Sequence, residues 1–331
     1  MQPYTEQFYQ GQRDGSQRSA KEIVPLVLKL IHPKSIIDVG CGIGTWLSVF
    51  KELGVEEIFG VDGDHVDKKI LQIPEERFCV RNLEKPFQLN RQFDLVVSLE
   101  VAEHLSKESA KSFVKTLTEL GPVILFSAAI PFQGGVHHVN EQWPDYWVKH
   151  FQDYGYIVID LLRKKIWQND DVEWWYAQNI LIFVRKDYLE HHPLLKKESE
   201  TTTTSQLSVV HPKKYLQAVA LYLATEDIAT LIPSQDTFIM VDQAQFGIGV
   251  TGGRRALPFL ERDGVYWGLP PDDETAIREL ERLRKSGASF MVFGWPAFWW
   301  FNYYTDLHRY LVSNFRCLLQ NNRLVIFDLR R

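Results

Sequence analysis

Short apolar runs alternate with amphipathic stretches along the first 187 residues of the chain. The runs are rich in Val and Ile, as expected of strands that are covered on both faces of a sheet. Strands are expected at 35–39, 57–61, 78–80, 93–99, 122–127, 156–162 and 179–184. Apolar positions spaced three or four residues apart predict helices at 19–31, 45–53, 106–120 and 143–154. This order predicts an α/β fold, and the polar segment 1–18 is expected to form an arm or lid.

A second, shorter alternation follows a polar stretch. Residues 196–206 contain no apolar periodicity and include four consecutive threonines, which is typical of a linker. Beyond it, a helix is expected at 216–223, another after Pro270-Pro271, and strands at 237–241, 289–293 and 323–327. We therefore divide the chain into a domain at 1–187, a linker at 188–209 and a small α/β accessory domain at 210–331.

Composition narrows the classes of function. The 331 residues carry a net charge of −5, so no basic surface for nucleic acid or an anionic membrane is indicated. No stretch approaches the roughly 20 apolar residues of a membrane span, and the N-terminus lacks a signal-peptide core. The three cysteines are far apart, which favours a reducing, cytoplasmic location. The oligomeric state is not indicated.

The segment 38–45, Asp-Val-Gly-Cys-Gly-Ile-Gly-Thr, joins the first expected strand to a helix. A dinucleotide fingerprint, G-x-G-x-x-G, would need its third glycine at position 45, which is Thr45. The pattern D-x-G-x-G-x-G instead resembles motif I of the class I S-adenosylmethionine (SAM)-dependent methyltransferases. The resemblance covers about residues 1–187 and implies a Rossmann-like seven-stranded sheet with SAM as cofactor. It places the methionine part of SAM against Gly40, Cys41, Gly42 and Gly44, with Asp38 ordering the turn.

Further SAM contacts are implied downstream of this motif. Asp62 closes the second expected strand, where a carboxylate can accept both ribose hydroxyls, and Asp64 is an alternative. Asn82-Leu83 stands where the family often has Asp-Leu, so Asn82 is expected to accept from the adenine amino group. Glu100, at the end of the fourth strand, completes the expected SAM set.

The same rim of the sheet carries the candidate chemistry. Glu100, Glu103 and His104 follow the fourth strand, and His137-His138 follow the fifth. One interpretation is a divalent metal site, for example for Mg or Zn, formed by Glu100, Glu103, His104 and His138. This arrangement resembles the metal-binding residues of small-RNA 2′-O-methyltransferases and ubiquinone-pathway O-methyltransferases. A second interpretation makes His104 or His138 a general base, oriented by Glu103. In a third, the histidines only cap helices and tie loops.

The segment 138–147 resembles bacterial methyltransferases of glycan and natural-product pathways, which implies a small-molecule or glycan acceptor rather than nucleic acid. We expect O-methylation of a hydroxyl on a carbohydrate or glycosylated small molecule. Trp143, Trp147, Trp174 and Trp175 are either sugar-stacking residues or core. Two alternatives remain open: another small-molecule acceptor, and a non-catalytic SAM-binding partner that acts through its C-terminal domain.

Two stretches of the accessory domain stand out. Arg254 and Arg255 are adjacent cations that could bind an anionic group such as a sugar phosphate. Residues 294–301 contain five aromatic side chains after a buried strand, and they could line a pocket, form an interface or pack in the core.

Overall fold

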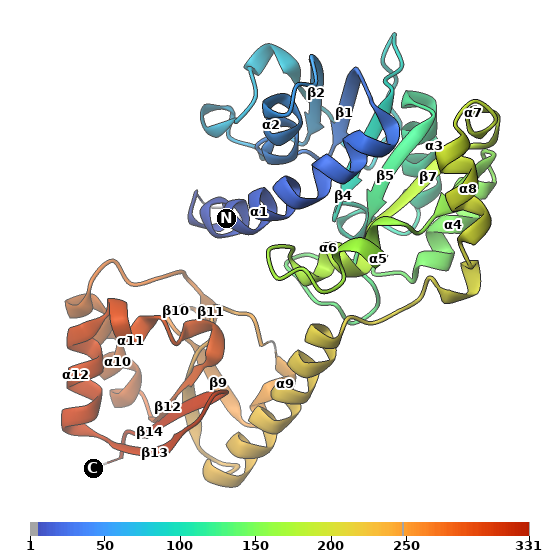
Figure 1. The fold of residues 1–331 in the computed structure, drawn as a ribbon. Coiled ribbons are helices and arrows are strands. Elements are labelled where there is room, and N and C mark those ends of the chain that lie inside the picture. Colours follow the sequence, from blue (N-terminus) through green and yellow to red (C-terminus); the bar gives the residue numbers. More distant parts are fainter. Residues whose placement is uncertain (1–5, 247, 331) are drawn as a thin grey trace. The chain divides into compact units, whose positions relative to one another are not determined.

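The computed structural model describes residues 6–246 and 248–330 and divides into two compact units at Lys214/Tyr215. The first unit contains a seven-stranded sheet in the order β3-β2-β1-β4-β5-β7-β6 (Figure 1). Only β7 runs antiparallel to its neighbours. The strands are β1 (Ser35–Val39), β2 (Glu57–Asp62), β3 (Phe78–Val80), β4 (Leu95–Leu99), β5 (Val123–Ser127), β6 (Tyr156–Ile159) and β7 (Leu181–Arg185). The predicted seven-stranded α/β fold is confirmed.

Helices cover both faces of this sheet, because neighbouring residues of each central strand point to opposite sides. Ile36 packs with one apolar core and Ile37 with the other, and both are fully buried. The first core includes side chains of α1 (Glu6–Ile31), α2 (Thr45–Glu52), α5 (Leu162–Ile166) and α6 (Trp174–Asn179). The second core includes those of α3 (Ala110–Leu120) and α4 (Pro144–Gln152).

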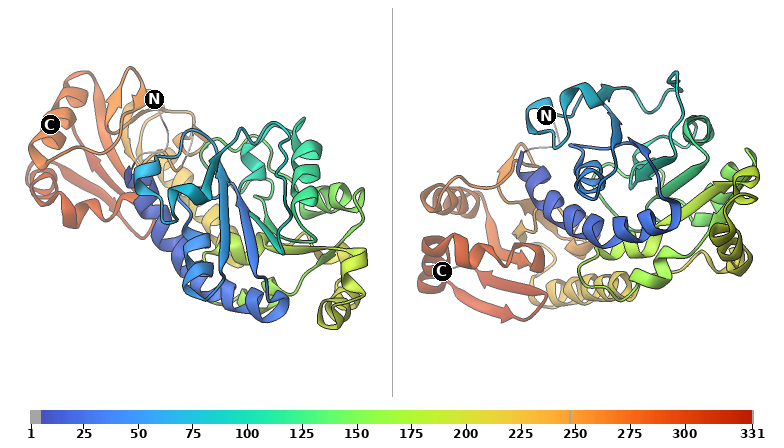
Figure 2. Two further views of the ribbon diagram at one scale, coloured as in Figure 1. Left: turned by 90° about the horizontal axis from the view of Figure 1, so that it is seen from above. Right: turned by 45° about the horizontal axis from the view of Figure 1, so that its top comes forward.

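The segment expected as an arm at 1–18 is helical from Glu6, within the described residues. Helix α1 is the long blue helix in both views of Figure 2 and packs against α2. Side-chain contacts hold its first half in place: the Ser16 hydroxyl lies 3.2 Å from that of Tyr176, and Ser19 Oγ accepts a hydrogen bond from the backbone N–H of Glu173 at 3.0 Å. Pro25 lies inside the helix on its exposed side.

The expected linker at 188–209 also differs from the structure. It contains the end of α7 (Lys186–Leu189) and all of α8 (Pro193–Thr201), and Leu195 and Leu207 are fully buried in the cores of the first unit. Arg163 donates to the carbonyl of Leu207 at 2.7 Å, which fixes the chain further. Together with Leu189, which is also buried, these leucines anchor the segment without helical periodicity, so the boundary lies later, at Lys214/Tyr215.

The second unit is built on a five-stranded sheet in the order β13-β14-β12-β8-β9, with a separate β10–β11 hairpin. The strands are β8 (Thr237–Val241), β9 (Arg255–Pro258), β10 (Glu261–Arg262), β11 (Val265–Tyr266), β12 (Ala288–Gly294), β13 (Arg316–Gln320) and β14 (Leu324–Asp328). Helices α10 (Asp273–Lys285), α11 (Trp300–Tyr303) and α12 (Thr305–Asn314) cover one face, and α9 (Pro212–Leu231) covers the other. Sequence patterns did not predict β9, the hairpin or β13, since these strands are short or largely exposed.

None of the helices in the described ranges combines the length and hydropathy that a membrane crossing requires.

Candidate active site

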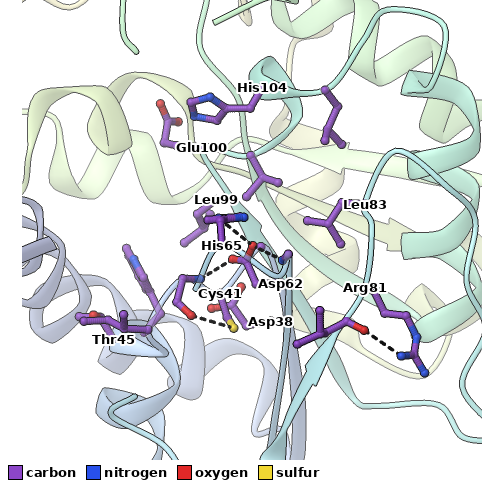
Figure 3. Close-up of a pocket in the computed structure, with 18 of the residues that line it drawn as sticks. Asp38, Cys41, Thr45, Asp62, His65, Arg81, Leu83, Leu99, Glu100 and His104 are labelled. Carbon is purple, nitrogen blue, oxygen red and sulfur yellow. Dashed lines mark hydrogen bonds and ion pairs between the residues drawn. The ribbon is translucent and has the colours of Figure 1, made fainter. Parts of the chain in front are cut away.

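A cavity of about 860 Å³ opens at the carboxyl ends of β1, β2 and β4 (Figure 3). Ligands of open α/β sheets bind at this edge. The residues predicted to bind SAM that line it are Asp38, Gly40, Cys41, Gly42, Asp62, Asn82, Leu83 and Glu100. Gly44 is not part of the lining; it precedes α2 and packs against Ile73. Of the proposed catalytic residues, His104 lines the cavity directly.

The turn after β1 depends on glycine at two positions for different reasons. Gly40 has φ +87°, and a Cβ there would lie 2.3 Å from Cγ2 of Val101. Gly42 has φ +54° but faces open space, with no atom within 4 Å of a Cβ position. The first glycine therefore allows close packing with the loop after β4, and the second leaves room for a ligand at the turn.

Asp62 joins this turn to the end of β2. One carboxylate oxygen accepts from Gly42 N–H at 2.6 Å and the other from Gly63 N–H at 2.6 Å. Burial raises the pKa of Asp62, and these two hydrogen bonds oppose the rise. Burial, followed by the charge of Asp62, raises the pKa of Asp38 well above its usual range. The family resemblance gave the ordering of the turn to Asp38, whereas here Asp62 makes the two hydrogen bonds.

Three residues of the predicted metal set meet beside the cavity. Glu103, His104 and His138 each offer a ligand atom within 4.8 Å of the others, and the two imidazole rings meet edge to face. Glu103 is fully buried, and neither carboxylate oxygen meets a donor at hydrogen-bonding geometry among the described residues. Burial, followed by the charge of Glu100, raises its pKa well above the usual range. A buried carboxylate without partners is costly, so this group is suited to a ligand that supplies positive charge.

The two histidines of this group differ in their environment. Burial and the neighbouring His138 lower the pKa of His104 to about 4, so its imidazole is neutral at pH 7. His104 Nδ1 has no hydrogen-bond partner in the described part of the chain. His138 Nδ1 lies 2.9 Å from Glu141 Oε1, which fixes the ring and leaves Nε2 for a ligand or a proton. Sequence reasoning missed Glu141, because a glutamate three residues after a histidine is common on any loop.

Comparison with known proteins identifies the family of the chain. A family model described as a methyltransferase domain matches residues 9–179, more than half of the chain. The chain belongs to the methyltransferase-domain family. It is a SAM-dependent methyltransferase, and the seven-stranded sheet and glycine turn are the parts of the first unit that resemble this class.

Among solved structures, the methyltransferase is similar to DesVI of Streptomyces venezuelae, at 16% identity and a TM-score of 0.42, over 54% of this chain and 96% of that one. It is also similar to magnesium protoporphyrin IX methyltransferase (ChlM) of Synechocystis PCC 6803 with bound SAM. The identity is 19% and the TM-score 0.40, over 53% of this chain and 83% of that one. The methyltransferase domain of bacterial CtHen1 matches at 23% identity and a TM-score of 0.36, over 50% of this chain and 97% of that one. A search of curated proteins found no significant match.

The cavity of the methyltransferase contains polar groups that a ligand could use. Open space at Gly42 adjoins the Asp62 carboxylate. Its Oδ1 also lies 3.5 Å from His65 Nε2, and its Oδ2 can accept a further hydrogen bond. Asn82 lines the same cavity, where its amide oxygen already accepts from Glu84 N–H at 2.9 Å. In Figure 3, Asp62 and Cys41 lie on one side of the cavity, and Glu100 and His104 lie on another.

Glu100 is held by amide side chains that the sequence did not reveal. Its backbone has φ +54°, and its carboxylate accepts from Gln133 Nε2 at 2.9 Å and from Asn179 Nδ2 at 3.1 Å. Asn179 also donates to Gln133 Oε1 at 2.9 Å, which closes a three-membered network. Glu100 is therefore not among the three residues whose donor atoms meet at the candidate metal group, and its carboxylate is fixed between the cavity and α6.

The tryptophans proposed for stacking fall into different environments. Trp147 is 2% exposed and packs in the core against Phe126. Trp174 and Trp175 are half-buried, whereas Trp143 is 40% exposed. Phe132, on the same segment as Trp143 and His138, is 88% exposed. Of the four tryptophans, Trp143 is thus the one exposed beside the candidate chemistry.

Proposed function

We propose that the enzyme O-methylates a hydroxyl of a carbohydrate or glycosylated small molecule, and that Glu103, His104 and His138 hold a divalent cation such as Mg²⁺ or Zn²⁺. The observation that carries the metal proposal is the buried Glu103 carboxylate, which lies beside two imidazoles and forms no hydrogen bond at normal geometry with the described residues. One carboxylate and two imidazoles form a donor set suited to divalent transition metals. A cation bound there would lower the pKa of an acceptor hydroxyl.

The roles of the remaining residues follow from their positions. The glycine turn and Asp62 bind and orient the methyl donor, with the ribose hydroxyls at Asp62 and the adenine amino group at Asn82. Glu100 forms the wall between the donor site and the metal group. Glu141 holds the tautomer of His138 that presents Nε2 toward the acceptor. Catalysis then consists mainly of alignment and removal of the hydroxyl proton.

The carbohydrate acceptor is supported by the surface around the histidines. Phe132, Val139 and Trp143 are all exposed on the loop between β5 and α4 that carries His138. Exposed aromatic rings beside polar groups suit a ligand with one apolar face and one hydroxylated face. The chain's net charge of −5 does not favour a nucleic acid.

Metal binding tests the first part of the proposal. Chelator-treated protein should bind about one equivalent of Zn²⁺ or Mn²⁺ in calorimetry, and Glu103→Gln and His104→Ala should each weaken binding at least about tenfold. Glu108→Gln, an exposed glutamate five positions away, is the matched control and should bind metal normally.

Turnover tests the acceptor. Labelled SAM and a glycan extract should give a methyl ether, metal addition should restore the activity of stripped enzyme, and His138→Ala should abolish it. Full turnover of metal-free enzyme that is still lost in His138→Ala would instead support the second candidate, a general base formed by the His138–Glu141 pair. Transfer only to acceptors without sugar hydroxyls would contradict the carbohydrate assignment.

A further inference from the structure

The second unit has a candidate ligand site of its own, independent of the proposed function. Strands β9 and β12 flank β8 on opposite sides, and both run parallel to it. The chain leaves β8 first toward β9 and later, through α10, reaches β12. The strand order therefore reverses at β8, and open α/β sheets bind ligands beside the carboxyl end of a strand where the order reverses.

A cavity of about 540 Å³ is lined by residues of β8, β9 and the tip of the β10–β11 hairpin; Figure 1 labels these elements, β8 excepted. Its volume falls in the range of small-molecule sites. Its floor is apolar and includes Phe238, Met240 and Pro258. The polar residues that line it include Asp242 and Tyr266, and Arg255, which pairs with Thr237 at the start of β8, lies toward its other end. An apolar floor with a few convergent polar groups is typical of a site that orients one small ligand.

Asp242 follows β8 directly and is 6% exposed. One oxygen accepts from Ala244 N–H at 3.1 Å and the other from Phe246 N–H at 2.8 Å. These bonds fix the carboxylate, and Gln243 and Ala244 both take positive φ in the loop it organises. Each oxygen can accept one more hydrogen bond, so the group can bind two hydroxyls of one ligand.

Tyr266 and Arg255 supply donors at the same cavity. Burial, followed by the charge of Asp242, raises the pKa of Tyr266 to about 12, so its hydroxyl stays protonated. Arg255 is exposed, and no hydrogen bond or ion pair engages its guanidinium within the described ranges, although its charge helps to lower the pKa of Glu261. A ligand with hydroxyls at one end and an anionic group at the other matches these donors and acceptors.

Arg254, the neighbouring cation, has a different role. Its guanidinium donates to the carbonyls of Ile232 at 2.5 Å, Gly252 at 2.7 Å and Ala229 at 2.8 Å. Two of these carbonyls lie at the end of α9, so Arg254 closes that helix against the following loop. The two arginines are adjacent in the sequence but differ in role. Arg254 supports the fold, whereas Arg255 is exposed at the surface.

We propose that this cavity binds a phosphorylated sugar, with ring hydroxyls at Asp242, the ring against Met240 and Pro258, and the phosphate at Arg255. A sugar 1-phosphate and a nucleotide sugar share this chemistry, so both are tested. A free nucleobase would leave the Asp242 carboxylate without its two hydroxyls, and a lipid would leave all three polar groups unpaired.

The test is calorimetry on the full chain with saturating S-adenosylhomocysteine, which keeps the first unit's cavity occupied. The probes are glucose 1-phosphate, N-acetylglucosamine 1-phosphate, UDP-glucose, free glucose and inorganic phosphate. At least one sugar phosphate should bind, and Asp242→Asn and Arg255→Ala should each weaken binding about tenfold or more. Arg278→Ala, on the exposed surface of α10, should have no effect.

Because Asp242 also organises its loop, Tyr266→Phe provides a second variant that leaves those backbone hydrogen bonds intact. It should weaken sugar-phosphate binding and leave thermal unfolding unchanged. The proposal is overturned if no sugar phosphate binds up to millimolar concentration, or if binding survives both Arg255→Ala and Tyr266→Phe. Inorganic phosphate binding as tightly as the sugar phosphates would also overturn it, because Asp242 and the apolar floor would then have no role.

Discussion

Both units place an aspartate at the carboxyl end of a buried parallel strand, and in both the carboxylate binds backbone amides. Asp62 and Asp242 are each 6% exposed. Asp62 reaches across to Gly42, twenty residues earlier, and joins two strands' loops at a turn made of glycine. Within the described part of the chain, the Asp242 side chain accepts hydrogen bonds from its own loop, where Gln243 and Ala244 take the positive φ values. The same electrostatic arrangement can thus rest on a visible glycine pattern or on ordinary residues held by tertiary contacts.

The largest effect is expected from substitution of Gly40, which tests how far the first aspartate's site depends on its glycine turn. Gly40→Ala adds a Cβ at 2.3 Å from Val101 at φ +87°, so the turn must shift away from Asp62. We expect SAM affinity to fall by about 100-fold or more, from crowding and left-handed strain together. Gly42→Ala meets only the strain, because no atom lies within 4 Å, and should lose about tenfold. Calorimetry with SAM compares them, and equal losses would show that packing on Val101 is unimportant.

The glycine turn also marks what the sequence could predict. The three glycines and Asp38 were recognisable because motif I has a fixed spacing within one strand–turn–helix unit, and Asp62 was chosen because it closes the next strand. Gln133 and Asn179, which hold Glu100, lie 33 and 79 residues from it along the chain. No local pattern distinguishes such amides from surface residues. They could be assigned to the site only when the fold brought α6 and the loop after β5 to the end of β4.

The same contrast between local patterns and tertiary contacts explains the errors in the predicted fold. Strands with apolar residues on both faces, such as β1 and β8, followed directly from their Val and Ile content. The segment at 188–209 was predicted as a linker because only three of its leucines, Leu189, Leu195 and Leu207, are anchored in a core, and their spacing is not helical. Residues 1–18 were predicted as an arm because they are polar, whereas the described part is helical and is held by polar contacts of Ser16 and the following Ser19.

The next largest effect is expected in how the stability of each unit depends on pH. His104 is in the first unit's cavity, and no histidine is among the described residues that line the second cavity. Since the pKa of His104 falls from 6.5 to about 4 on folding, the unfolded chain takes up its proton first as pH drops. Its contribution to stability is complete above pH 6.5 and is lost between pH 6.5 and 4, by at most about 3 kcal/mol.

The measurement is a difference between variants. Asp38 and Glu103 have raised pKa values and act in the opposite sense, because the folded state then holds protons that the unfolded state releases. Urea unfolding of wild type and His104→Asn at pH 7 and pH 5 cancels their contribution. Wild type should lose more stability than the variant on acidification. An identical loss would place the acid-sensitive group elsewhere, and His191→Asn, an exposed histidine, controls for removing any imidazole.

The smallest expected effect tests the division between the two arginines. Arg254→Ala removes three hydrogen bonds to the carbonyls of Ala229, Ile232 and Gly252 and should lower the free energy of unfolding of the second unit by about 1–3 kcal/mol. Arg255→Ala removes an exposed side chain of equal charge and should change stability by less than about 0.5 kcal/mol. Urea unfolding followed by tryptophan fluorescence compares them, since Trp295 and Trp300 pack in this unit.

The two arginine substitutions are expected to have opposite effects on ligand binding and on stability. If Arg255 serves a ligand and Arg254 serves the fold, then sugar-phosphate binding should fall in Arg255→Ala while stability holds. Arg254→Ala should show the reverse pattern at temperatures where it remains folded. Equal destabilisation by both substitutions would mean that Arg255 supports the loop after β8 as Arg254 supports α9. The second unit would then lack the cation that distinguishes its cavity from a gap in packing, and Asp242 would be a structural counterpart of Asp62 without a ligand of its own.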